Sequence, residues 1–399
     1  MYLDCIKTAH NNIKDVINLT PLIYSPILSK KHENNIYIKC ENLQLTGAYK
    51  IRGALNKIRG LSEEDKIKGV VCSSAGNHAQ GVAYASNLLG VNSTIVMPQT
   101  TPYLKVQSTI DYGGNVVLHG ECYDDSYLKA KELSESLNKT FIHPFDDLNI
   151  IYGQGTIALE IFDQLKNVDV IICPIGGGGL ISGISLAAKE INPNIKIIGV
   201  QAEGANSMEL SFKTGRKLDL KNVNTIADGI AVKCPGNLTY NFIKTYVDDI
   251  VTVSDKEISE AFLILCEKHK LLAEASGAVS IAALKKLNFK NKNIVSVISG
   301  GNIDMLTISS LINDGLVEHG RLFCFSIELP DTPWQIFNIS RLLSELNANI
   351  VNLEHNTFKA NNKLKNVQVE VTVETNGKSH INLIKNKFKE EGFELNQMY

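Results

Sequence analysis

Cysteine pairs of any recognisable spacing are absent from this chain. Its 399 residues include eight cysteines, but no C-x-x-C pair and no Cys/His cluster occurs among positions 5, 40, 72, 122, 173, 234, 266 and 324. This excludes the frameworks of small disulfide-rich proteins and the usual structural zinc sites. The polar N-terminus MYLDCIKTAHNNIKD also lacks the apolar core of a signal peptide, so we expect reduced thiols and a cytoplasmic location.

The sequence also lacks a strong charge of either sign and a convincing membrane span. Its formal net charge is -2, so we expect no nucleic-acid partner and no anionic-membrane partner. No charged residue occurs between Asp169 and Lys189, a length that could suit a transmembrane helix. Because Pro174 and the four glycines Gly176–Gly179 interrupt this stretch, we interpret it as a strand, a loop and the start of a helix.

What the chain does contain, from about residue 35 to 310, is an alternation of short Val/Ile-rich runs and helical patterns. The candidate strands cover residues 36–40, 69–74, 92–98, 115–120, 140–144, 169–175, 195–202, 249–254 and 294–299. Most are apolar without strict alternation, which is typical of parallel strands buried on both faces. The sequence therefore predicts an α/β fold in which helices cover a mostly parallel sheet.

The pattern changes after about residue 320. The predicted elements follow in the order βαββαβ: a strand, an amphipathic helix, two strands, a second helix and a last strand. The first of the two middle strands covers 349–358. This order predicts a ferredoxin-like module with an antiparallel sheet. Asp331 or Thr332 is the expected N-cap of its first helix. Because the module has no evident nucleophile or metal set, regulation, oligomerisation and a purely structural role all stay open.

Polar and glycine-rich loops follow several candidate strands, where open α/β sheets bind their ligands. SSAGNHAQG (73–81) could bring backbone N–H groups and the Asn77 amide to an anion, although a helix cap at Ser74 or Asn77 explains part of this pattern. A lone His78 is more often structural than catalytic.

A run of four glycines follows the strand at 169–175. PIGGGGLISG (174–183) can cradle a phosphate with backbone N–H groups at a helix N-terminus. A dinucleotide fingerprint competes with this interpretation, but the glycine spacing is unusual for it. In ISGGNID (298–304), Ser299 and Asn302 could hydrogen-bond a ring or a carboxylate.

A lysine in an unusual setting completes the candidate site. Lys50, in QLTGAYKIRGA, lies among Gly47, Ala48, Gly53 and Ala54, where backbones can approach closely or something else can occupy the space. Together with a phosphate cradle, this lysine suggests a Schiff base to a phosphorylated aldehyde, pyridoxal phosphate. The chain has no obvious metal triad and no Ser/His/Asp order.

The order and spacing of six motifs resemble the fold-type II pyridoxal-phosphate enzymes, and within them most closely the threonine ammonia-lyases (threonine dehydratases). The resemblance covers about residues 15–315 and implies a tryptophan synthase β-like, two-lobed catalytic domain with parallel sheets. We place this domain at 1–320, with a small lobe at about 53–150 inserted in the large lobe. The tail, 321–399, resembles a single ACT domain, an amino-acid-sensing module. The six motifs are ENLQLTGAYKIRGA, SSAGNHAQGVA, GGGGL, TIADGIAVKCPG, EASGAVSIAAL and SGGN.

The resemblance implies roles for residues in these motifs. Lys50 would be the Schiff-base lysine and catalytic base, and Tyr49 would flank the cofactor ring. Asn77 would contact the 3-hydroxyl of the cofactor, and Ser299 would face its pyridine nitrogen. Backbone amides would hold the phosphate at Gly176, Gly177, Gly178, Gly179 and Leu180. The substrate carboxylate would bind at Ser74, Ala75, Gly76, Asn77 and His78.

The implied reaction is a β-elimination. The Lys50 amine, with its pKa lowered by desolvation, would remove the Cα proton of L-threonine, and 2-oxobutanoate and ammonia would be released. L-Serine would give pyruvate by the same route. A serine ammonia-lyase of broad specificity is the runner-up, because a methyl group changes binding by only about 1–3 kcal/mol. Isoleucine biosynthesis and threonine catabolism both fit such an enzyme.

Two positions refine this expectation. Ser299, in place of a carboxylate, would leave the pyridine nitrogen largely neutral, which favours loss of the β-leaving group over transamination. In the related serine racemases a serine that acts as an acid/base precedes the G-N-H sequence. Because Ala75 precedes Gly76 here, we expect little racemisation.

The resemblance also implies a monovalent or divalent cation. Glu203, Ser207 and Glu209, in QAEGANSMEL, lie where related enzymes hold such an ion, although the ligand types depart from theirs. An exposed loop with ordinary acidic residues is an equally good interpretation.

The tail departs from the ACT pattern at one position. Where D-x-P-G-x-L is usual, this chain has D-T-P-W-Q (331–335), so Trp334 replaces a glycine. The indole would block or reshape an amino-acid site, or pack against a partner subunit. The resemblance implies an amino-acid or nucleotide effector and a homo-oligomer, either a dimer or a tetramer. A non-catalytic amino-acid sensor is the alternative from another class, which the intact Lys50 disfavours.

Overall fold

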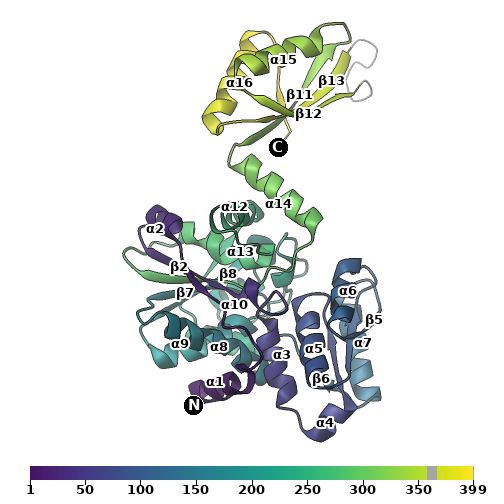
Figure 1. Ribbon diagram of the computed structural model, residues 1–399, viewed down its shortest axis with the longest axis vertical. Coiled ribbons are helices and arrows are strands. Elements are labelled where there is room, and N and C mark those ends of the chain that lie inside the picture. Colours follow the sequence, from purple (N-terminus) through teal and green to yellow (C-terminus); the bar gives the residue numbers. More distant parts are fainter. Residues whose placement is uncertain (357–365, 399) are drawn as a thin grey trace. The chain divides into compact units, whose positions relative to one another are not determined.

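The computed structural model of the chain describes residues 1–356 and 366–398 (Figure 1). The chain divides into two compact units, Met1–Asp304 and Met305–Tyr399. Within the described ranges, no helix has the length and apolar composition that crossing a membrane requires. The uncharged stretch after Asp169 instead forms a strand and a helix, as its proline and glycines predict.

The first unit contains a six-stranded sheet, which confirms the predicted mostly parallel arrangement. Its strands are β1 (Leu22–Tyr24), β2 (Asn35–Cys40), β7 (Val170–Pro174), β8 (Lys196–Ala202), β9 (Asp249–Val253) and β10 (Asn293–Ile298). Their order is β1-β2-β10-β7-β8-β9. All neighbours are parallel except the short β1, which pairs antiparallel with β2 and was not predicted.

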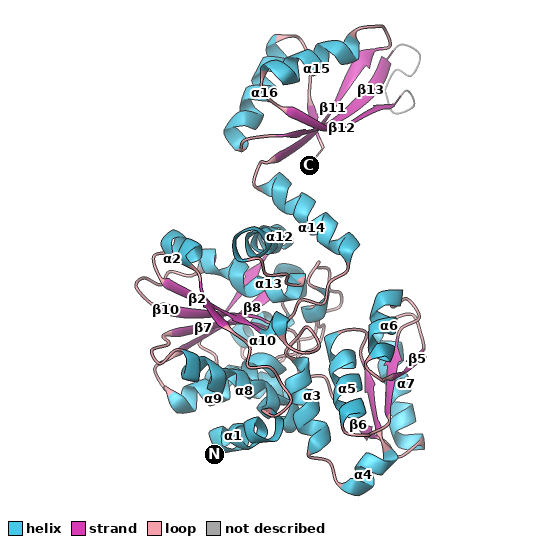
Figure 2. Ribbon diagram, viewed as in Figure 1, coloured by secondary structure: helices cyan, strands magenta, loops and turns pink. Residues whose placement is uncertain are grey.

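Helices cover both faces of this sheet. In Figure 2, α8 and α9 lie on one side of it and α12 and α13 on the other. Because both faces are covered, most residues of the central strands β7, β8 and β10 are apolar and buried. The helices that precede β3 or follow β6 in this unit are α1 (Tyr2–Ile13), α2 (Pro26–His32), α3 (Lys50–Arg59), α4 (Glu63–Lys68), α8 (Leu148–Gln164), α9 (Gly179–Ile191), α10 (Ser207–Thr214), α11 (Asn237–Tyr246), α12 (Asp255–Ile264) and α13 (Ala275–Ala282).

A second sheet lies in the same unit and is built from one continuous stretch of sequence. Its parallel strands pair in the order β5-β4-β3-β6, and they all fall between β2 and β7 in the chain. This arrangement gives the unit two lobes, as the fold class predicts. The elements are β3 (Val70–Ser73), α5 (Asn77–Leu88), β4 (Ser93–Met97), α6 (Tyr103–Asp111), β5 (Asn115–Leu118), α7 (Tyr123–Ser136) and β6 (Thr140–Phe141).

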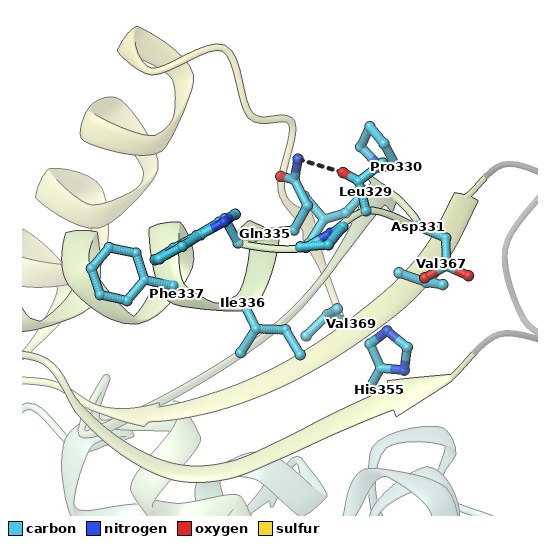
Figure 3. A pocket seen from close by; sticks show the side chains of 12 residues that line it. Leu329, Pro330, Asp331, Gln335, Ile336, Phe337, His355, Val367 and Val369 are labelled. Carbon is cyan, nitrogen blue, oxygen red and sulfur yellow. Dashed lines mark hydrogen bonds between the residues drawn. The ribbon is translucent and has the colours of Figure 1, made fainter.

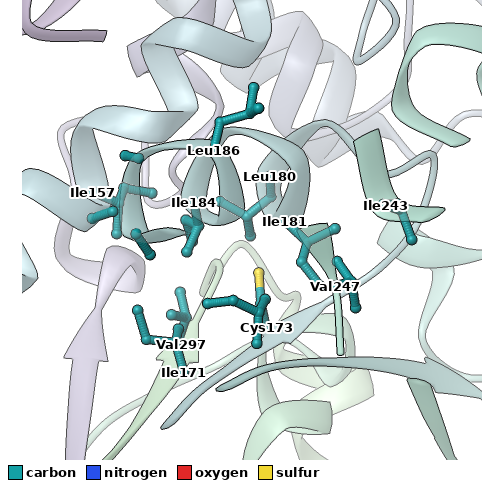
Figure 4. Close-up of a cluster of buried hydrophobic side chains, with 14 of the residues drawn as sticks. Ile157, Ile171, Cys173, Leu180, Ile181, Ile184, Leu186, Ile243, Val247 and Val297 are labelled. Atoms are coloured by element: carbon teal, nitrogen blue, oxygen red, sulfur yellow. The ribbon is translucent and has the colours of Figure 1, made fainter. Parts of the chain in front are cut away.

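An aliphatic core fixes α9 on the first sheet (Figure 4). Leu180 and Ile184 of α9 face Ile171 and Cys173 of β7 and Val297 of β10. All five side chains are at most 3% exposed. Burying a side chain of this size contributes about 1.5–3 kcal/mol. This core therefore holds the N-terminus of α9, and the glycine loop before it, in a fixed position.

Parallel pairing places the carboxyl ends of β2, β7 and β10 at one edge of the first sheet. The Lys50 segment follows β2, the glycine loop follows β7, and the Ser299 loop follows β10. Ligands of open α/β sheets bind at this edge. Three of the loops singled out in the sequence therefore meet where a ligand is expected.

The second unit has the predicted βαββαβ order with an antiparallel sheet. Its strands pair in the order β12-β13-β11-β14 around a core that includes Phe323, Phe325 and Phe388. Its elements are α14 (Met305–Glu318), β11 (Leu322–Pro330), α15 (Gln335–Glu345), β12 (Asn349–Asn356), β13 (Asn366–Glu374), α16 (Lys378–Glu390) and β14 (Asn396–Gln397).

Two expectations about this unit concern boundaries. The domain boundary expected after residue 320 lies between α14 and β11, and it stays a prediction about domain organisation. The strand expected at 349–358 is β12 as far as Asn356, and its last two residues lie outside the described residues.

The start of α15 corrects one prediction. Its N-cap is Trp334 rather than Asp331 or Thr332. Trp334 has a φ of +76°, in the left-handed region. A residue with this backbone conformation cannot belong to a right-handed helix, so α15 begins only at Gln335.

Candidate active site

Lys50 is the first residue of α3 and lies beside the loop that follows β10. Tyr49 N donates to Ser299 O at 3.1 Å, and Lys50 Nζ donates to Pro144 O at 2.9 Å. Burial lowers the pKa of Lys50 from 10.5 to about 8, although the nearby Glu274 carboxyl opposes this shift. About half of the amine is therefore neutral at pH 8, where an ordinary lysine is almost fully charged.

One of the small residues near Lys50 serves helix packing rather than a ligand. A Cβ on Gly53 would lie 2.4 Å from Gln154 Nε2 and 2.8 Å from Ile150 O, both in α8. A Cβ on Gly153 would lie 2.6 Å from Gly53 Cα. The backbones of α3 and α8 are thus in contact here, so the space beside Gly53 is filled by protein.

The glycine loop after β7 leads directly into α9. Gly178 has a φ of +97°, which a glycine adopts at no steric cost. A Cβ on Gly177 would lie 2.4 Å from the Phe145 ring, and one on Gly179 would lie 3.0 Å from the Phe145 backbone. Thr239 Oγ1 donates to Gly177 O at 2.6 Å and holds the loop in place.

Only the backbone of this loop is available to a ligand. The Leu180 side chain points into the core (Figure 4), so Leu180 can offer only its N–H. The first N–H groups of α9 have no intrahelical partner. Beside them, the absence of a side chain at Gly176 allows close packing against Ile230, because a Cβ on Gly176 would lie 3.1 Å from the Ile230 Cα. A side-chain-free loop at a helix N-terminus is a suitable phosphate site.

The polar loop after β3 opens a second helix N-terminus. Ser74, Ala75 and Gly76 connect β3 to α5, and Gly76 N donates to Ser74 Oγ at 3.3 Å. Helix α5 starts at Asn77, so its first N–H groups also lack intrahelical partners. These groups suit a carboxylate, as the sequence predicts.

His78 is buried and its ring is already engaged. Its Nε2 lies 3.0 Å from Ile142 O, a carbonyl that can only accept a hydrogen bond. Burial, with the charge of Lys50, lowers the pKa of His78 to about 3, so the ring is neutral. The contribution expected from His78 to a carboxylate site is therefore limited to its backbone N–H.

Two further predicted contacts, Asn77 and Ser299, lie around Lys50. Asn77 Nδ2 donates to Glu274 Oε1 at 2.7 Å, and Asn302 Nδ2 donates to Asn77 Oδ1 at 2.7 Å. Ser299 is 4% exposed, yet within the described residues its Oγ makes no hydrogen bond to protein. Its hydroxyl is thus available to a ligand atom.

These features fit pyridoxal phosphate. The cofactor needs an amine to bind its aldehyde, donors for its phosphate, and polar contacts to its ring nitrogen and ring oxygen. The Lys50 amine, the glycine loop, Ser299 and Asn77 are of these types. The Tyr49 ring, whose centroid is 5.4 Å from Lys50 Nζ, is an aromatic surface beside the amine.

Sequence reasoning missed two residues of this site. Phe145 packs against the glycine loop, and Glu274 accepts from Asn77. Phe145 follows the strand expected at 140–144, and nothing in its type sets it apart. Glu274 had one available signal, because it is the single acid in the apolar stretch EASGAVSIAAL.

The candidate cation ligands have protein partners. Ser207 Oγ donates to Val232 O at 2.9 Å, the Glu209 carboxylate accepts from Lys213, and Lys286 lies 3.5 Å from Glu203 Oε1. No group of three His, Cys, Asp or Glu side chains that could hold a metal ion occurs in the described part of the chain. The cation stays a prediction.

Fold and site together define a fold-type II, cofactor-dependent enzyme. Residues 13–300 match the family described as pyridoxal-phosphate dependent enzymes, and the chain belongs to this family. It is 44% identical to the L-threonine ammonia-lyase of Thermotoga maritima over 98% of each chain. Processed threonine deaminase isoform 2 of Solanum lycopersicum is similar in structure, with a TM-score of 0.77 and 41% identity over 79% of this chain and 88% of that one. Maize serine racemase has a TM-score of 0.75 and 36% identity over 80% and 98%.

The second unit has a pocket of its own, of about 260 Å³ (Figure 3). It lies between the loop before α15 and strands β12 and β13. Its polar lining includes Asp331, Gln335 and His355, among apolar side chains such as Ile336 and Val369. A small cavity with a few polar groups suits a small polar ligand.

The strain at Trp334 leads to a prediction about stability. Trp334 is 72% exposed and makes an edge contact with Phe337 at 5.6 Å, so both Trp334→Gly and Trp334→Ala lose the same indole contacts. Because φ is positive here, the glycine variant should be more stable than the alanine variant by about 1 kcal/mol. Urea unfolding of the two full-length variants measures this difference.

A matched pair of variants provides the control. Ser344 is exposed in the last turn of α15, where the backbone is helical. At this position alanine should be the more stable residue, by about 1 kcal/mol over glycine. If glycine is not favoured over alanine at 334, the left-handed strain is absent in solution.

Proposed function

We propose that this protein is an L-threonine ammonia-lyase that converts L-threonine to 2-oxobutanoate and ammonia, and L-serine to pyruvate. The observation that carries the proposal is Lys50, a partly buried lysine with a pKa of about 8. It lies at the sheet edge where the glycine loop begins. Further support comes from the 44% identity with the Thermotoga maritima L-threonine ammonia-lyase over nearly the whole chain.

In this proposal each site residue has one task. Bound pyridoxal phosphate supplies an electron-accepting ring that stabilises negative charge at the amino-acid Cα. Lys50 is the base, and its neutral amine takes the Cα proton. The N–H groups of Gly176–Gly179 and of Leu180 bind the phosphate. Tyr49 flanks the ring, and the neutral Ser299 hydroxyl at the pyridine nitrogen leaves this nitrogen unprotonated.

The loop before α5 binds the substrate and the ring oxygen. The backbone from Ser74 to His78 holds the amino-acid carboxylate at the helix N-terminus. The Asn77 amide donates to the ring oxygen. Ala75 has no hydroxyl that could return a proton to the opposite face of Cα, so elimination prevails over racemisation in this chain.

The proposal extends to regulation and assembly. The catalytic domain is 1–320 and the ACT domain is 321–399. The pocket beside Asp331 and His355 takes an amino acid as effector, because a carboxylate and an imidazole can pair with its amino and carboxyl groups. The enzyme acts in the cytoplasm as a homo-oligomer, and a cation bound at Glu203, Ser207 and Glu209 is part of the proposal.

The assay of 2-oxoacid formation tests the proposed function. Purified protein with added pyridoxal phosphate receives L-threonine or L-serine, and D-serine is measured alongside. A higher kcat/KM for L-threonine, with little D-serine, supports the proposal. Activity on L-serine alone would move the assignment to a serine ammonia-lyase, and no turnover of either substrate would contradict both.

The depressed pKa of Lys50 predicts how cofactor capture depends on pH. Only the neutral amine can attack an aldehyde, and its fraction falls about tenfold per pH unit below the pKa. The rate at which cofactor-free protein captures pyridoxal phosphate should therefore rise from pH 6 to about 8 and level off above it. Stopped-flow absorbance measures this rate, and a rise that continues to pH 10 would show an ordinary lysine.

A further inference from the structure

Glu274 is a buried carboxyl group at the candidate site that the reaction outlined above does not use. It is the residue before α13, and its N–H donates to Gly300 O at 3.0 Å. Its side chain lies close to the chain at Gly300, where a Cβ would be 2.6 Å from Glu274 Oε1. It is 7% exposed, and its described hydrogen-bond partner is an amide, that of Asn77.

The hydrogen bonds around Asn77 have only one consistent direction. Thr46 O is a backbone carbonyl and can only accept, so the Asn302 group 2.7 Å from it is the donor Nδ2. The same Nδ2 also lies 2.7 Å from Asn77 and 2.9 Å from Gln80 Oε1, and because an amide nitrogen does not accept hydrogen bonds, Asn77 presents its oxygen there. The Asn77 nitrogen is then left to face Glu274 at 2.7 Å.

One donor of Asn77 remains after this accounting. Its Nδ2 has two hydrogens, and Glu274 takes one of them. The second is available to an acceptor in the site. Without an acceptor at Glu274, the amide would have an unpaired N–H in a buried place and would lose a restraint on its rotation.

We propose that Glu274 is a positioning residue that orients the Asn77 amide so that its second N–H donates to the ring oxygen of bound pyridoxal phosphate. This inference rests on the cofactor contact proposed above for Asn77. Glu274 itself has no contact with the cofactor in the proposal, because it acts through the amide.

The charges around Glu274 are consistent with this role. Burial raises its pKa to about 7, with a further rise from Asp228, while the Asn77 hydrogen bond, Lys105 and Lys50 lower it. The carboxyl is therefore close to half protonated at neutral pH. Both the protonated and the ionised carboxyl group have an oxygen that can accept a hydrogen bond from Asn77. The proposed role therefore requires an acceptor oxygen at position 274 and does not require a full negative charge.

Two substitutions separate acceptor capacity from charge. Glu274→Gln keeps a side chain of the same length that ends in an acceptor oxygen, whereas Glu274→Leu removes every acceptor. Full-length protein freed of cofactor is titrated with pyridoxal phosphate and followed by absorbance. Glu274→Leu should weaken cofactor affinity by about tenfold or more, whereas Glu274→Gln should stay within about threefold of the wild type. Equal losses in the two variants would overturn the proposal.

A double-variant comparison tests whether the effect passes through Asn77. Asn77→Ala should itself weaken cofactor affinity, and adding Glu274→Leu to it should cause little further loss. An undiminished second loss means that Glu274 acts independently, which contradicts the inference. If Asn77→Ala alone leaves affinity unchanged, the cofactor contact of Asn77 is wrong and the inference fails with it, while the lyase assay above stays unaffected.

A second variant keeps the test decisive if Glu274→Leu does not fold. Glu274→Asp keeps the carboxyl group but withdraws its oxygens from Asn77 by one methylene group, so the hydrogen bond that orients this amide is lost. Cofactor affinity should then fall by about tenfold, and the absorbance maximum of the lysine-bound cofactor should shift, because its ring oxygen has lost a donor. Unchanged affinity and an unchanged maximum would overturn the proposal.

Discussion

Replacing Lys50 by alanine is expected to lower the turnover of L-threonine by at least about 10³-fold, because the base and the covalent anchor of the cofactor are lost together. Lys50 Nζ donates to Pro144 O at 2.9 Å, and the aromatic ring of Tyr49 lies beside it. The substitution removes this amine without a change in the helix, since alanine is the best helix former. Turnover is measured as 2-oxobutanoate formed per unit time.

Three measurements separate loss of chemistry from loss of fold. Lys66→Ala, in the exposed helix α4, is the matched control and should keep its activity. Reduction with borohydride should fix the cofactor to the peptide that contains Lys50 in the wild type, but not in the variant. An added small amine should partly restore turnover to Lys50→Ala. Full activity in the variant would remove Lys50 from the proposed chemistry.

The sequence was most informative about the strands. The nine predicted strands correspond to β2 through β10, and most of them are Val/Ile-rich runs buried on both faces, which leave a strong signal. The strand β1 was missed because Leu22–Tyr24 is only 3 residues long and lies at the sheet edge. Three residues carry too little periodicity to be recognised without knowledge of β2.

The candidate site was predictable where its residues belong to a continuous motif. Lys50, the glycine loop and Ser299 each follow a strand, and parallel pairing then brings them to one edge. The partners of these residues come from distant segments. Glu274 meets Asn77 across 197 positions of sequence, and no local pattern of residues indicates that contact.

Buried charge was also invisible in the sequence, since lysine and arginine are usually solvated. Two residues beyond Lys50, Arg52 is 0% exposed and lies between the carboxylates of Glu41 and Glu160. Lys39 is equally buried and pairs with Glu160 at 2.6 Å. The group thus contains two cations and two carboxylates from three segments of the chain, since Lys39 and Glu41 are close in sequence whereas Arg52 lies in α3 and Glu160 in α8.

The geometry of this group makes Arg52 its centre. Arg52 Nε donates to Glu41 Oε2 at 2.7 Å, and Arg52 Nη1 donates to Glu160 Oε1 at 2.6 Å. Its Nη2 bridges the two acids, at 2.8 Å from Glu41 Oε1 and 3.0 Å from Glu160 Oε2. Because Arg52 and Lys50 both lie in the first turn of α3, the group also anchors the catalytic segment.

The substitution Arg52→Met is therefore expected to be strongly destabilising. It leaves two buried carboxylates against the single cation Lys39, and breaking a buried ion pair from one side costs about 3–5 kcal/mol. The expected loss of stability comes from a buried carboxylate that is left without a cation. Lost side-chain volume contributes little, since methionine fills much of the space of arginine. The free energy of unfolding in urea of the full-length protein measures the loss.

Restoring charge balance should recover much of that loss, and this outcome distinguishes charge from packing. Arg52→Met combined with Glu41→Gln leaves Lys39 and Glu160 as a balanced pair, so the double variant should be more stable than Arg52→Met alone. Arg341→Met is the exposed control, because Arg341 pairs with Glu345 on the surface of α15 and its loss should cost less than about 1 kcal/mol. If Glu41→Gln adds to the damage instead, the hydrogen bonds of Glu41 outweigh its charge. In that case the group would stabilise the Lys50 segment by packing and hydrogen bonding rather than by balanced charge.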